Sequence, residues 1–352
     1  MRKCYTFFMI GTNFEMKKNN VLKVFAALCK EKSLSRKEIE EKTELSWGTV
    51  STICNDLIAH GVLTVQKQNG GLGRPSETLS LSLDNFLLLG VDVNSVGLCF
   101  NVVNLAGVCV FNSFCEITTP ERESVLNALV QELEKILTNF TTVVALCVSM
   151  QGKIDAECGV SVRAHFFKDW ENVPVVSFLE ERFHLPTFFY HDTECLLAYH
   201  LDQDERVKNL QNGFVVRMDE GVGMAMMIRG VPYQGRENPE IGHTMVKLSG
   251  KKGGVLEDFA SFSKLKSDGT LTAAHYTATA VYNLYAVLSP DFILLDGKSV
   301  DEIPNFFEQV LASLTLITDI EVPLIKARYK RDAAAIGACL LSKEKVFETV
   351  LF

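Results

Sequence analysis

The chain has 352 residues, of which 47% are hydrophobic and 22% are charged, and its formal net charge is −8. This length predicts two or three domains, and the composition excludes a disordered protein, which would combine few hydrophobic residues with a high net charge. No apolar run reaches the roughly 18 residues that cross a bilayer, and no cleavage site follows the short apolar N-terminus, so we expect a cytosolic protein.

The charge is unevenly distributed along the chain. Residues 1–82 carry 12 Lys and Arg against 8 Asp and Glu, a net charge of +4. The remaining residues carry 23 basic and 35 acidic side chains, a net charge of −12. A slightly basic head on an acidic body is typical of a small nucleic-acid-binding module joined to a domain with another task.

Three helical patterns follow one another in residues 20–60. Asn20 stands where it can cap the first helix, and Ser35 with Glu38 matches a capping box at the start of the second. The third begins at Ser46 and has apolar residues at helical spacing. Because only a short turn separates the last two, the pattern predicts a helix-turn-helix, whose second helix enters the major groove of DNA.

Two strand patterns follow, at residues 62–66 and 78–83, and they flank a Gly-rich loop that suits a hairpin wing. We therefore predict a winged helix-turn-helix at residues 20–83, after an N-terminal extension at residues 1–19; the alternative is a helical protein-interaction module. The side chains expected to contact double-stranded operator DNA can bond base edges or phosphates: Trp47, Thr49, Ser51, Thr52, Asn55, Lys67 and Arg74. Because one copy would bind weakly, we expect a homodimer that reads two half-sites.

From residue 84 onward the pattern changes to α/β. The first series predicts strands at 87–93, 98–103, 107–114 and 143–149 and a helix at 124–137. The second predicts strands at 214–218, 224–228 and 292–295 and helices at 256–266, 273–288 and 332–341. A repeated series predicts two similar lobes with a ligand cleft between them: lobe I at 84–203, with the C-terminal helix 332–352, and lobe II at 204–331.

Ten cysteines are scattered singly, without the paired spacing of a metal cluster or a disulfide framework. We therefore expect reduced thiols, mostly buried, and no bound metal.

Short motifs, in their order and spacing, resemble the ROK family (repressors, open reading frames and kinases), in its transcriptional-repressor branch with the xylose and N-acetylglucosamine repressors. They are Leu-Ser-Trp-Gly-Thr-Val-Ser at 45–51, Gly-Arg-Pro at 73–75, Leu-Gly-Val-Asp at 89–92, Trp-Glu-Asn-Val-Pro at 170–174, Glu-Ile-Gly-His at 240–243, Leu-Glu at 256–257 before Ala-Ser at 260–261, and Arg-Asp-Ala at 331–333 before Ile-Gly-Ala at 336–338. The resemblance runs from residue 20 to the C-terminus. It implies an actin-like (ribonuclease-H-like) two-lobed body of the sugar-kinase type.

The family's kinases hold ATP phosphates in glycine-rich turns, and this chain departs from them at three places. The departures are Asn94-Ser95 in the first turn, Asp219-Glu220 at the entry of the second (with Gly221 and Gly223 kept), and Asp296-Gly297 in place of Gly-Gly. Carboxylates at a loop entry would repel phosphate. We therefore expect no kinase activity and no cofactor, and the resemblance makes Asp192 a vestigial catalytic base.

The resemblance also implies a sugar site, because carboxylates and an imidazole can pair with adjacent hydroxyls. The residues that match the family's sugar contacts are Gly152, Asp192, Glu240, His243 and Glu257. The alternative is that Glu240 and His243 are a structural pair left from an ancestral pocket. Most relatives carry a Cys-rich zinc loop after this His; residues 249–255 contain no Cys, so we expect no zinc.

The leading hypothesis is a cytosolic, dimeric transcriptional regulator, a repressor of sugar-utilisation genes, in which a small sugar or sugar derivative shifts the arrangement of the lobes and of the DNA-binding heads. One alternative is an ATP-dependent sugar kinase with an attached DNA-binding domain. Another is a regulator without a sugar ligand, controlled by a protein partner.

Overall fold

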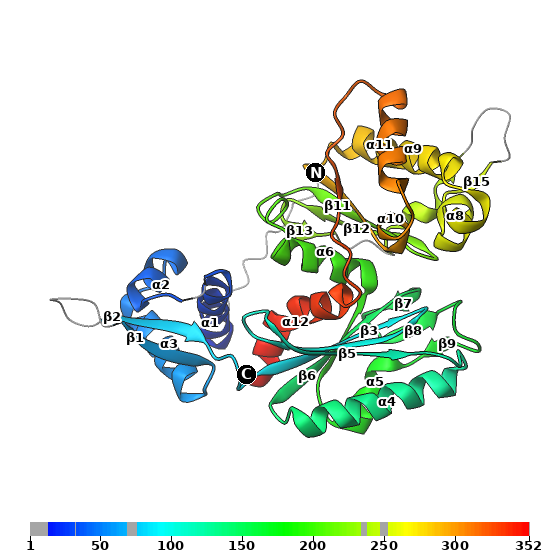
Figure 1. Ribbon diagram of the computed structural model, residues 1–352. Helices are drawn as coiled ribbons and strands as arrows, with labels where there is room; N and C mark the ends of the chain where they lie inside the picture. The colour runs from blue at the N-terminus through cyan, green and yellow to red at the C-terminus, as the bar shows by residue number, and fades with distance from the viewer. Residues whose placement is uncertain (1–12, 32, 69–75, 234–237, 247–252, 352) are drawn as a thin grey trace, which may run out of the picture.

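The structure is a computed structural model that describes residues 13–31, 33–68, 76–233, 238–246 and 253–351. Figure 1 shows a small head, formed by helices α1–α3 and strands β1 and β2, beside a larger body built around two five-stranded sheets. The C-terminal helix α12 (Ala333–Leu351) lies between the head and the body. Among the residues described, no helix combines the length and apolarity needed to cross a membrane.

The head contains α1 (Asn13–Lys30), α2 (Arg36–Thr43), α3 (Trp47–Ala59) and an antiparallel hairpin of β1 (Leu63–Gln68) and β2 (Ser76–Leu81). The predicted capping box is present: Ser35 Oγ accepts from Glu38 N at 3.3 Å, and Glu38 Oε2 accepts from Ser35 N at 2.7 Å. Ser46 caps α3, as predicted. Glu44 ends α2 in the left-handed conformation, with φ 56°, and this turns the chain into α3.

The first helix begins earlier than the sequence predicts. It starts at Asn13, so Asn20 lies inside α1 rather than at its cap, and the predicted extension at residues 1–19 ends in helix. The added turns have partners elsewhere in the chain, since Lys17 Nζ lies 3.8 Å from Asp56 Oδ2 and Lys18 Nζ lies 3.0 Å from Glu348 Oε2. Contacts of this kind are tertiary and override the preference of Asn for a cap.

Lobe I is built on the sheet β10-β6-β3-β4-β5. Its strands are β3 (Leu87–Asn94), β4 (Gly97–Asn104), β5 (Cys109–Glu116), β6 (Val143–Met150) and β10 (Thr187–His191). Alternate residues of the central strand face opposite layers: Leu89 packs toward α4 (Arg122–Asn139) and α5 (Val175–Phe183), and Leu88 packs toward α6 (Asp192–Gln203) and α12. A small sheet of β7 (Lys153–Asp155), β8 (Val160–Arg163) and β9 (Glu171–Val173) extends the lobe.

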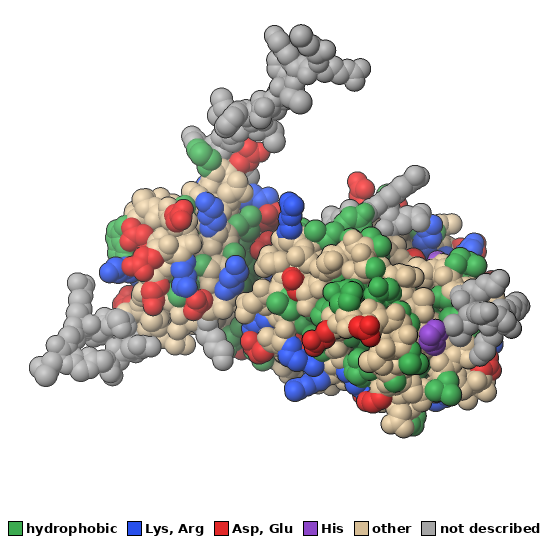
Figure 2. Space-filling model, turned by 90° about the horizontal axis from the view of Figure 1, so that it is seen from above, with side chains coloured by type: hydrophobic (Ala, Val, Ile, Leu, Met, Phe, Trp, Pro, Cys, Tyr) green, Lys and Arg blue, Asp and Glu red, His purple; other side chains and the backbone are tan. Residues whose placement is uncertain are grey.

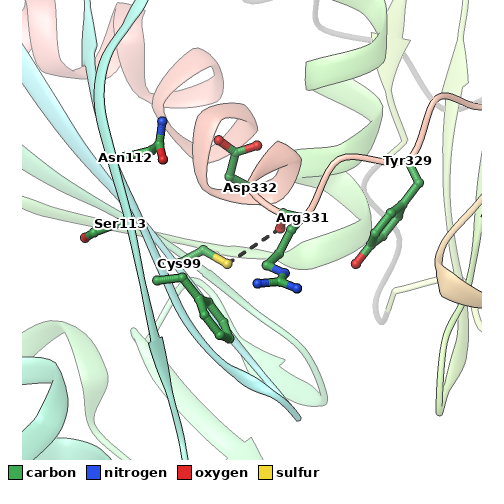
Figure 3. Close-up of a pocket in the computed structure, with 7 residues that line it drawn as sticks. Cys99, Asn112, Ser113, Tyr329, Arg331 and Asp332 are labelled. Atoms are coloured by element: carbon green, nitrogen blue, oxygen red, sulfur yellow. Dashed lines mark hydrogen bonds between the residues drawn. The ribbon is translucent and has the colours of Figure 1, made fainter.

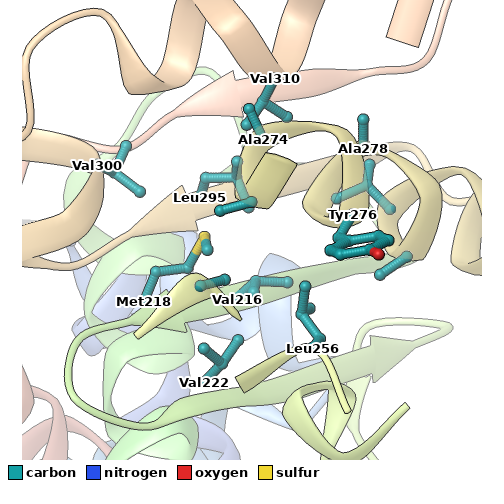
Figure 4. Close-up of a cluster of buried hydrophobic side chains, with 14 of the residues drawn as sticks. Val216, Met218, Val222, Leu256, Ala274, Tyr276, Ala278, Leu295, Val300 and Val310 are labelled. Carbon is teal, nitrogen blue, oxygen red and sulfur yellow. The ribbon is translucent and has the colours of Figure 1, made fainter. Parts of the chain in front are cut away.

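Lobe II repeats this topology in the sheet β13-β12-β11-β16-β17. The strands are β11 (Gly213–Met218), β12 (Val222–Ile228), β13 (Val231–Pro232), β16 (Phe292–Asp296) and β17 (Leu324–Lys326). In both sheets an antiparallel triplet is followed by two parallel strands, so the predicted duplication of α/β lobes is confirmed. The helices are α7 (Glu257–Ala260), α8 (Phe262–Asp268), α9 (Leu271–Leu288), α10 (Lys298–Asp301) and α11 (Phe306–Ile317). Figure 4 shows the buried side chains between this sheet and α9, with Tyr276 among them.

Two predicted helices have different bounds in the structure. The helix predicted at 256–266 is broken at Ser261, whose ψ of 152° is extended, because the next amide, Phe262 N, donates to the carbonyl oxygen of Asp219 at 2.7 Å. The helix predicted at 332–341 continues to Leu351, because its last turns pack on the head.

Helices α6 and α12 cross between the two sheets and join the lobes. A Cβ at Gly337 of α12 would overlap the carbonyl oxygen of Cys195 in α6, and a Cβ at Gly90 of β3 would overlap that of Ala335. Glycine is therefore required at both places for this close approach. The apolar core around these helices contains residues of both sheets. A movement of one lobe relative to the other therefore has to change the packing of α6 and α12.

Candidate DNA-binding and effector sites

Helix α3 presents a polar face to solvent. Ser46 Oγ accepts a hydrogen bond from Thr49 N at 3.3 Å and fixes the first turn, while the opposite face of the helix is buried in the head. Trp47 is 52% exposed, Thr52 and Asn55 are exposed, and Thr49 and Ser51 are half-buried. Trp47, Ser51 and Asn55 follow one another at four-residue steps and therefore form one stripe. The helix can offer this stripe to a groove of DNA.

Arg36 lies beside this stripe and was missed from the sequence. Its Nη2 donates to Asn55 Oδ1 at 2.8 Å, and its Nη1 lies 3.5 Å from Glu77 Oε2 on β2. One guanidinium thus joins α2, α3 and the hairpin and holds the amide of Asn55. No short-range pattern reveals such a contact, because Arg36 and Asn55 are 19 residues apart.

The hairpin carries the other two predicted DNA contacts. Lys67 lies in β1, paired in register with Glu77 of β2, whereas Arg74 lies outside the described residues. Figure 2 shows Lys and Arg side chains intermingled with Asp and Glu on the visible face of the head. On this face the basic side chains of the head are therefore interspersed with acidic ones.

The head and the body share a packed junction. The ring of Phe25 in α1 stacks on that of Phe347 in α12, with centroids 3.9 Å apart and an interplanar angle of 18°. Both rings are buried in the core of the head, together with Leu105 from the end of β4. The same helix α12 packs on α6 and β3 at its other end. A single helix therefore runs from the crossing between the lobes into the core of the head.

Asp192 is the first residue of α6, directly after β10, and is 2% exposed. Its Oδ2 lies 2.7 Å from Arg217 Nη1, and Arg217 Nε lies 2.7 Å from Asp219 Oδ2. Burial disfavours the charged form of Asp192, but His191 and Arg217 outweigh it and hold the pKa of this carboxyl below its usual value. Burial likewise opposes the charge of His191, and Asp192 outweighs it, so the pKa of His191 is raised.

Arg217 occupies the centre of a buried group of charges. It lies on β11, is 8% exposed, and has Asp92 of β3 as a third acidic neighbour. Burial disfavours its charge, but Asp219, Asp192 and Asp92 raise the pKa of the guanidinium well above its ordinary value. Burial also raises the pKa of Asp92, whose two oxygens accept from Ser149 Oγ at 2.7 Å and Asn94 Nδ2 at 2.8 Å.

Four of the five predicted sugar-site residues lie in one electrostatic neighbourhood. Burial raises the pKa of Glu240 although part of its surface is exposed, His191 and His243 oppose the rise, and Asp192 and Glu257 add to it. His243 is exposed on the 3-10 helix Ile241–His243. His243 N donates to the carbonyl oxygen of Glu240 at 3.1 Å, whereas the described residues show no side-chain hydrogen bond between the two, so the structural pair stays an alternative.

The fifth predicted residue, Gly152, borders this neighbourhood. It has φ 103°, and a Cβ there would lie 2.6 Å from the carbonyl oxygen of Arg163. Its neighbour Gln151 and Glu257 both approach Gly221: a Cβ at Gly221 would lie 3.8 Å from Gln151 Nε2 and 3.4 Å from Glu257 Oε2. Gln151 of lobe I therefore lies close to the turn at Gly221 of lobe II.

Backbone amides at the three turns where the chain departs from the family's kinases have acceptors within the protein. In the first turn, Asn94 Oδ1 accepts from Val96 N at 3.0 Å and from Gly97 N at 3.2 Å. In the second, Glu257 Oε2 accepts from Val222 N at 2.8 Å. Asp219 Oδ1 accepts from Lys298 N, beside the Asp296-Gly297 turn, at 2.7 Å. Amides that a phosphate could use are thus already bonded to side chains of the chain itself.

A shallow pocket of about 370 Å³ lies between the edge of the lobe I sheet and the crossover that leads into α12 (Figure 3). It is lined by Cys99, Asn112, Ser113, Phe114, Tyr329, Arg331 and Asp332. The guanidinium of Arg331 lies over the ring of Phe114, 4.5 Å from its centroid. Burial raises the pKa of the Cys99 thiol to about 12, so this thiol is not a nucleophile at neutral pH.

Within the described residues, no group of three or more His, Cys, Asp or Glu side chains has the geometry to hold a metal ion. The nine described cysteines are all free thiols.

Comparisons with known proteins show which proteins the chain resembles. The sequence profile of the ROK family matches residues 88–268. The xylose repressor of Caldicellulosiruptor bescii is 25% identical over 274 residues, which are 73% of this chain and 67% of that protein. The DNA-binding transcriptional dual regulator NagC of Escherichia coli K12 is 26% identical over 255 residues, 69% of this chain and 61% of that protein.

A solved structure resembles nearly the whole chain. It is a ROK family transcriptional regulator, a homologue of the E. coli Mlc protein, with a TM-score of 0.79 and 17% sequence identity. The superposition covers 96% of this chain and 99% of that one. At this identity the likeness establishes a shared fold alone.

Proposed function

Because the chain belongs to the ROK family, we propose that it is a DNA-binding transcriptional regulator, a repressor of sugar-utilisation genes, whose kinase-like body senses a sugar. The head, residues 20–83 in the boundaries predicted from the sequence, is a winged helix-turn-helix with α3 as the recognition helix. Lobe I at 84–203, with the C-terminal helix 332–352, and lobe II at 204–331 form the sensor. Because a regulator of this kind acts on DNA, we expect the protein in the cytosol.

The observation that carries the proposal is the junction between Phe25 and Phe347. A head that exposes the polar stripe of α3 is packed on the same helix that joins the two lobes. A sugar that binds one arrangement of the lobes more tightly than another therefore biases the position of the head. Relatives at 25% and 26% identity are a xylose repressor and a transcriptional dual regulator, which supports the same function.

The side chains at the turns that would bind ATP phosphates disfavour the alternative of a sugar kinase. Asp219 and Glu220 occupy the entry of the second turn, and amides at all three turns are bonded to Asn94, Glu257 and Asp219. Phosphate would have to displace these acceptors in a cleft that already holds several carboxylates. Calorimetry with ATP and Mg²⁺ tests this directly: saturable nucleotide binding together with sugar phosphorylation would replace the regulator by the enzyme.

A homodimer fits the proposal, because two recognition helices can read two half-sites. Exposed hydrophobic side chains on lobe II support it: Val287 at the end of α9 is 79% exposed and Leu316 on α11 is 82% exposed. Figure 2 shows hydrophobic side chains gathered on the visible face of the body. Sedimentation equilibrium of the wild type and of the V287E/L316E variant checks whether these side chains are covered by a second copy.

The DNA contacts are tested with labelled duplexes from upstream of the gene. We expect the T49A/R74A variant to bind 10-fold to 100-fold more weakly than the wild type at low salt, the loss of about two polar contacts. Unchanged affinity would show that α3 and the hairpin are not the contact surface. Thermal unfolding with xylose, N-acetylglucosamine, glucose and their phosphates identifies the effector; no stabilisation by any of them would favour control by a protein partner.

A further inference from the structure

Arg217 was not among the residues predicted from the sequence to bind DNA or an effector. It is a charged residue in a strand whose six residues are all buried, and its guanidinium bridges a carboxylate of each lobe. Nη1 lies 2.7 Å from Oδ2 of Asp192, at the start of α6, and Nε lies 2.7 Å from Oδ2 of Asp219, at the end of β11. Burying a guanidinium is costly unless carboxylates pair with it, and here two do so within hydrogen-bond distance.

The bridge leaves one oxygen of Asp192 without a hydrogen bond. Oδ1 is buried and has no hydrogen-bond donor among the described residues. His191 Nδ1 lies 2.9 Å away, but that nitrogen is hydrogen-bonded to Thr193 Oγ1 at 2.8 Å. The charge of His191 offsets part of the desolvation cost of this oxygen, and a hydroxyl of a bound molecule would supply the missing hydrogen bond.

We propose that Arg217 is the positioning residue of the effector site: it pairs with Oδ2 of Asp192 and leaves Oδ1 for a hydroxyl of the effector. This inference rests on the proposed sensor function. The same guanidinium also binds Asp219 of lobe II. The side chain that orients Asp192 therefore joins the two lobes as well. Effector binding and lobe arrangement are thereby coupled through one side chain.

The proposal predicts how removal of the charge changes the pH dependence. With Arg217 present, Asp192 stays ionised, and its contribution to stability is lost only as the pH falls through its lowered pKa. Without Arg217, His191 alone opposes burial and the acidic neighbours, so the pKa of Asp192 rises relative to the wild type and the carboxyl takes up a proton at higher pH. The charged or titratable groups that face Asp192 are His191, Glu194, Cys195, Arg217, Asp92 and Glu240.

The test compares the full chain with R217M, which keeps the length and loses the charge, and R217K, which keeps the charge and loses the two-pronged contact. R206M is the matched control, because Arg206 also pairs with an aspartate, Asp204 at 2.6 Å, but on the surface. If R217M does not fold, R217M/D219N removes one of the two unpaired carboxylates and replaces it. Sugar affinity is measured by calorimetry from pH 5.5 to 8 with the monosaccharide that stabilises the wild type.

We expect wild type and R206M to share one pH profile, and R217M to bind at least 10-fold more weakly at pH 5.5, with the deficit shrinking as the pH rises. R217K should restore the wild-type profile in part. A uniform loss of affinity at every pH, or no loss, would overturn the positioning role.

A second measurement needs no sugar and separates this inference from the proposed function. The unfolding free energies of D192N and of the chain with Asp192 are compared over the same pH range, in the Arg217 and the R217M backgrounds. We expect the advantage of the carboxylate to persist at pH 5.5 with Arg217 and to disappear there in R217M. Identical profiles in both backgrounds would overturn the role of Arg217, whereas failure of every sugar to bind would overturn the sensor function alone.

Discussion

Phe25 of α1 and Phe347 of α12 stack in the core of the head, with ring centroids 3.9 Å apart. One ring belongs to the predicted DNA-binding module, and the other belongs to the helix that crosses between the two lobes. The head is therefore attached to the body by a buried contact in addition to the chain connection. A change in the hinge can reach α3 because α1 packs against it.

Truncation of Phe347 tests this connection. We expect F347A to lower the free energy of unfolding of the head by about 3–5 kcal/mol, as for other buried Phe-to-Ala changes, and to leave DNA affinity insensitive to the effector. E348Q is the control: the Lys18–Glu348 pair is partly exposed, so its loss costs at most about 1 kcal/mol. Urea unfolding and DNA titrations measure both effects. An undiminished effector response in F347A would contradict a route through α12.

Because α12 and α6 cross closely, we expect replacement of glycine by alanine to lower stability at Gly337 and to raise it at Gly48. G337A places a methyl group against the carbonyl of Cys195, so we expect a loss of about 1–3 kcal/mol or more. G48A, on the open side of α3, meets nothing within 4 Å and should gain up to about 1 kcal/mol, because Ala favours helix more than Gly. Thermal unfolding of the two variants compares them directly. If G337A is as stable as G48A, the helices are not packed this closely.

The contact between Arg36 and Asn55 predicts a non-additive effect on DNA binding. We expect N55A to weaken operator binding by about 1–3 kcal/mol, the range for one specific base contact, and R36A to weaken it because the amide loses its orientation. The double variant should lose less than the sum of the two. N139A, an exposed asparagine at the end of α4, is the control. Strict additivity in anisotropy titrations would mean that the two side chains act separately.

The raised pKa of His191 predicts a stability that depends on pH. The folded-state pKa lies above the unfolded one, so His191 contributes its full stability below the unfolded value, about 6.5, and the contribution disappears as the pH rises through the folded value. We expect the wild type to exceed H191N in unfolding free energy at pH 5.5 and the difference to shrink toward pH 9. H165N, which removes an exposed imidazole instead of a buried one, is the control. A pH-independent difference for H191N would refute the charge on His191.

Much of the head was predictable because its signals are local. Ser35 and Ser46 cap the helices that follow them, Glu38 completes the capping box three residues after Ser35, and the turn at Glu44 is equally short-range. The start of α1 was predicted wrongly because Lys17 and Lys18 contact residues that lie far along the chain. Short-range patterns therefore predict which helices form more reliably than where each helix begins and ends.

The centre of the cleft was less predictable. Helix α6 escaped detection because it is buried nearly all round and lacks the one-sided apolar stripe of a surface helix. Asp192 was predicted through the family resemblance, whereas Arg217 was missed because its partner is 25 residues away. A charged residue inside the apolar strand Phe-Val-Val-Arg-Met was the available signal, since a buried charge demands a partner.

The central claim is that a sensing body controls a DNA-binding head without phosphoryl transfer. Its most direct test is a titration of the purified chain with a labelled duplex from upstream of its gene, at low salt and without ATP, repeated with each monosaccharide. The account predicts saturable binding that exceeds binding to a scrambled duplex and is shifted at least 10-fold by one of the sugars. Equal binding to both duplexes, with no response to any sugar, would contradict it.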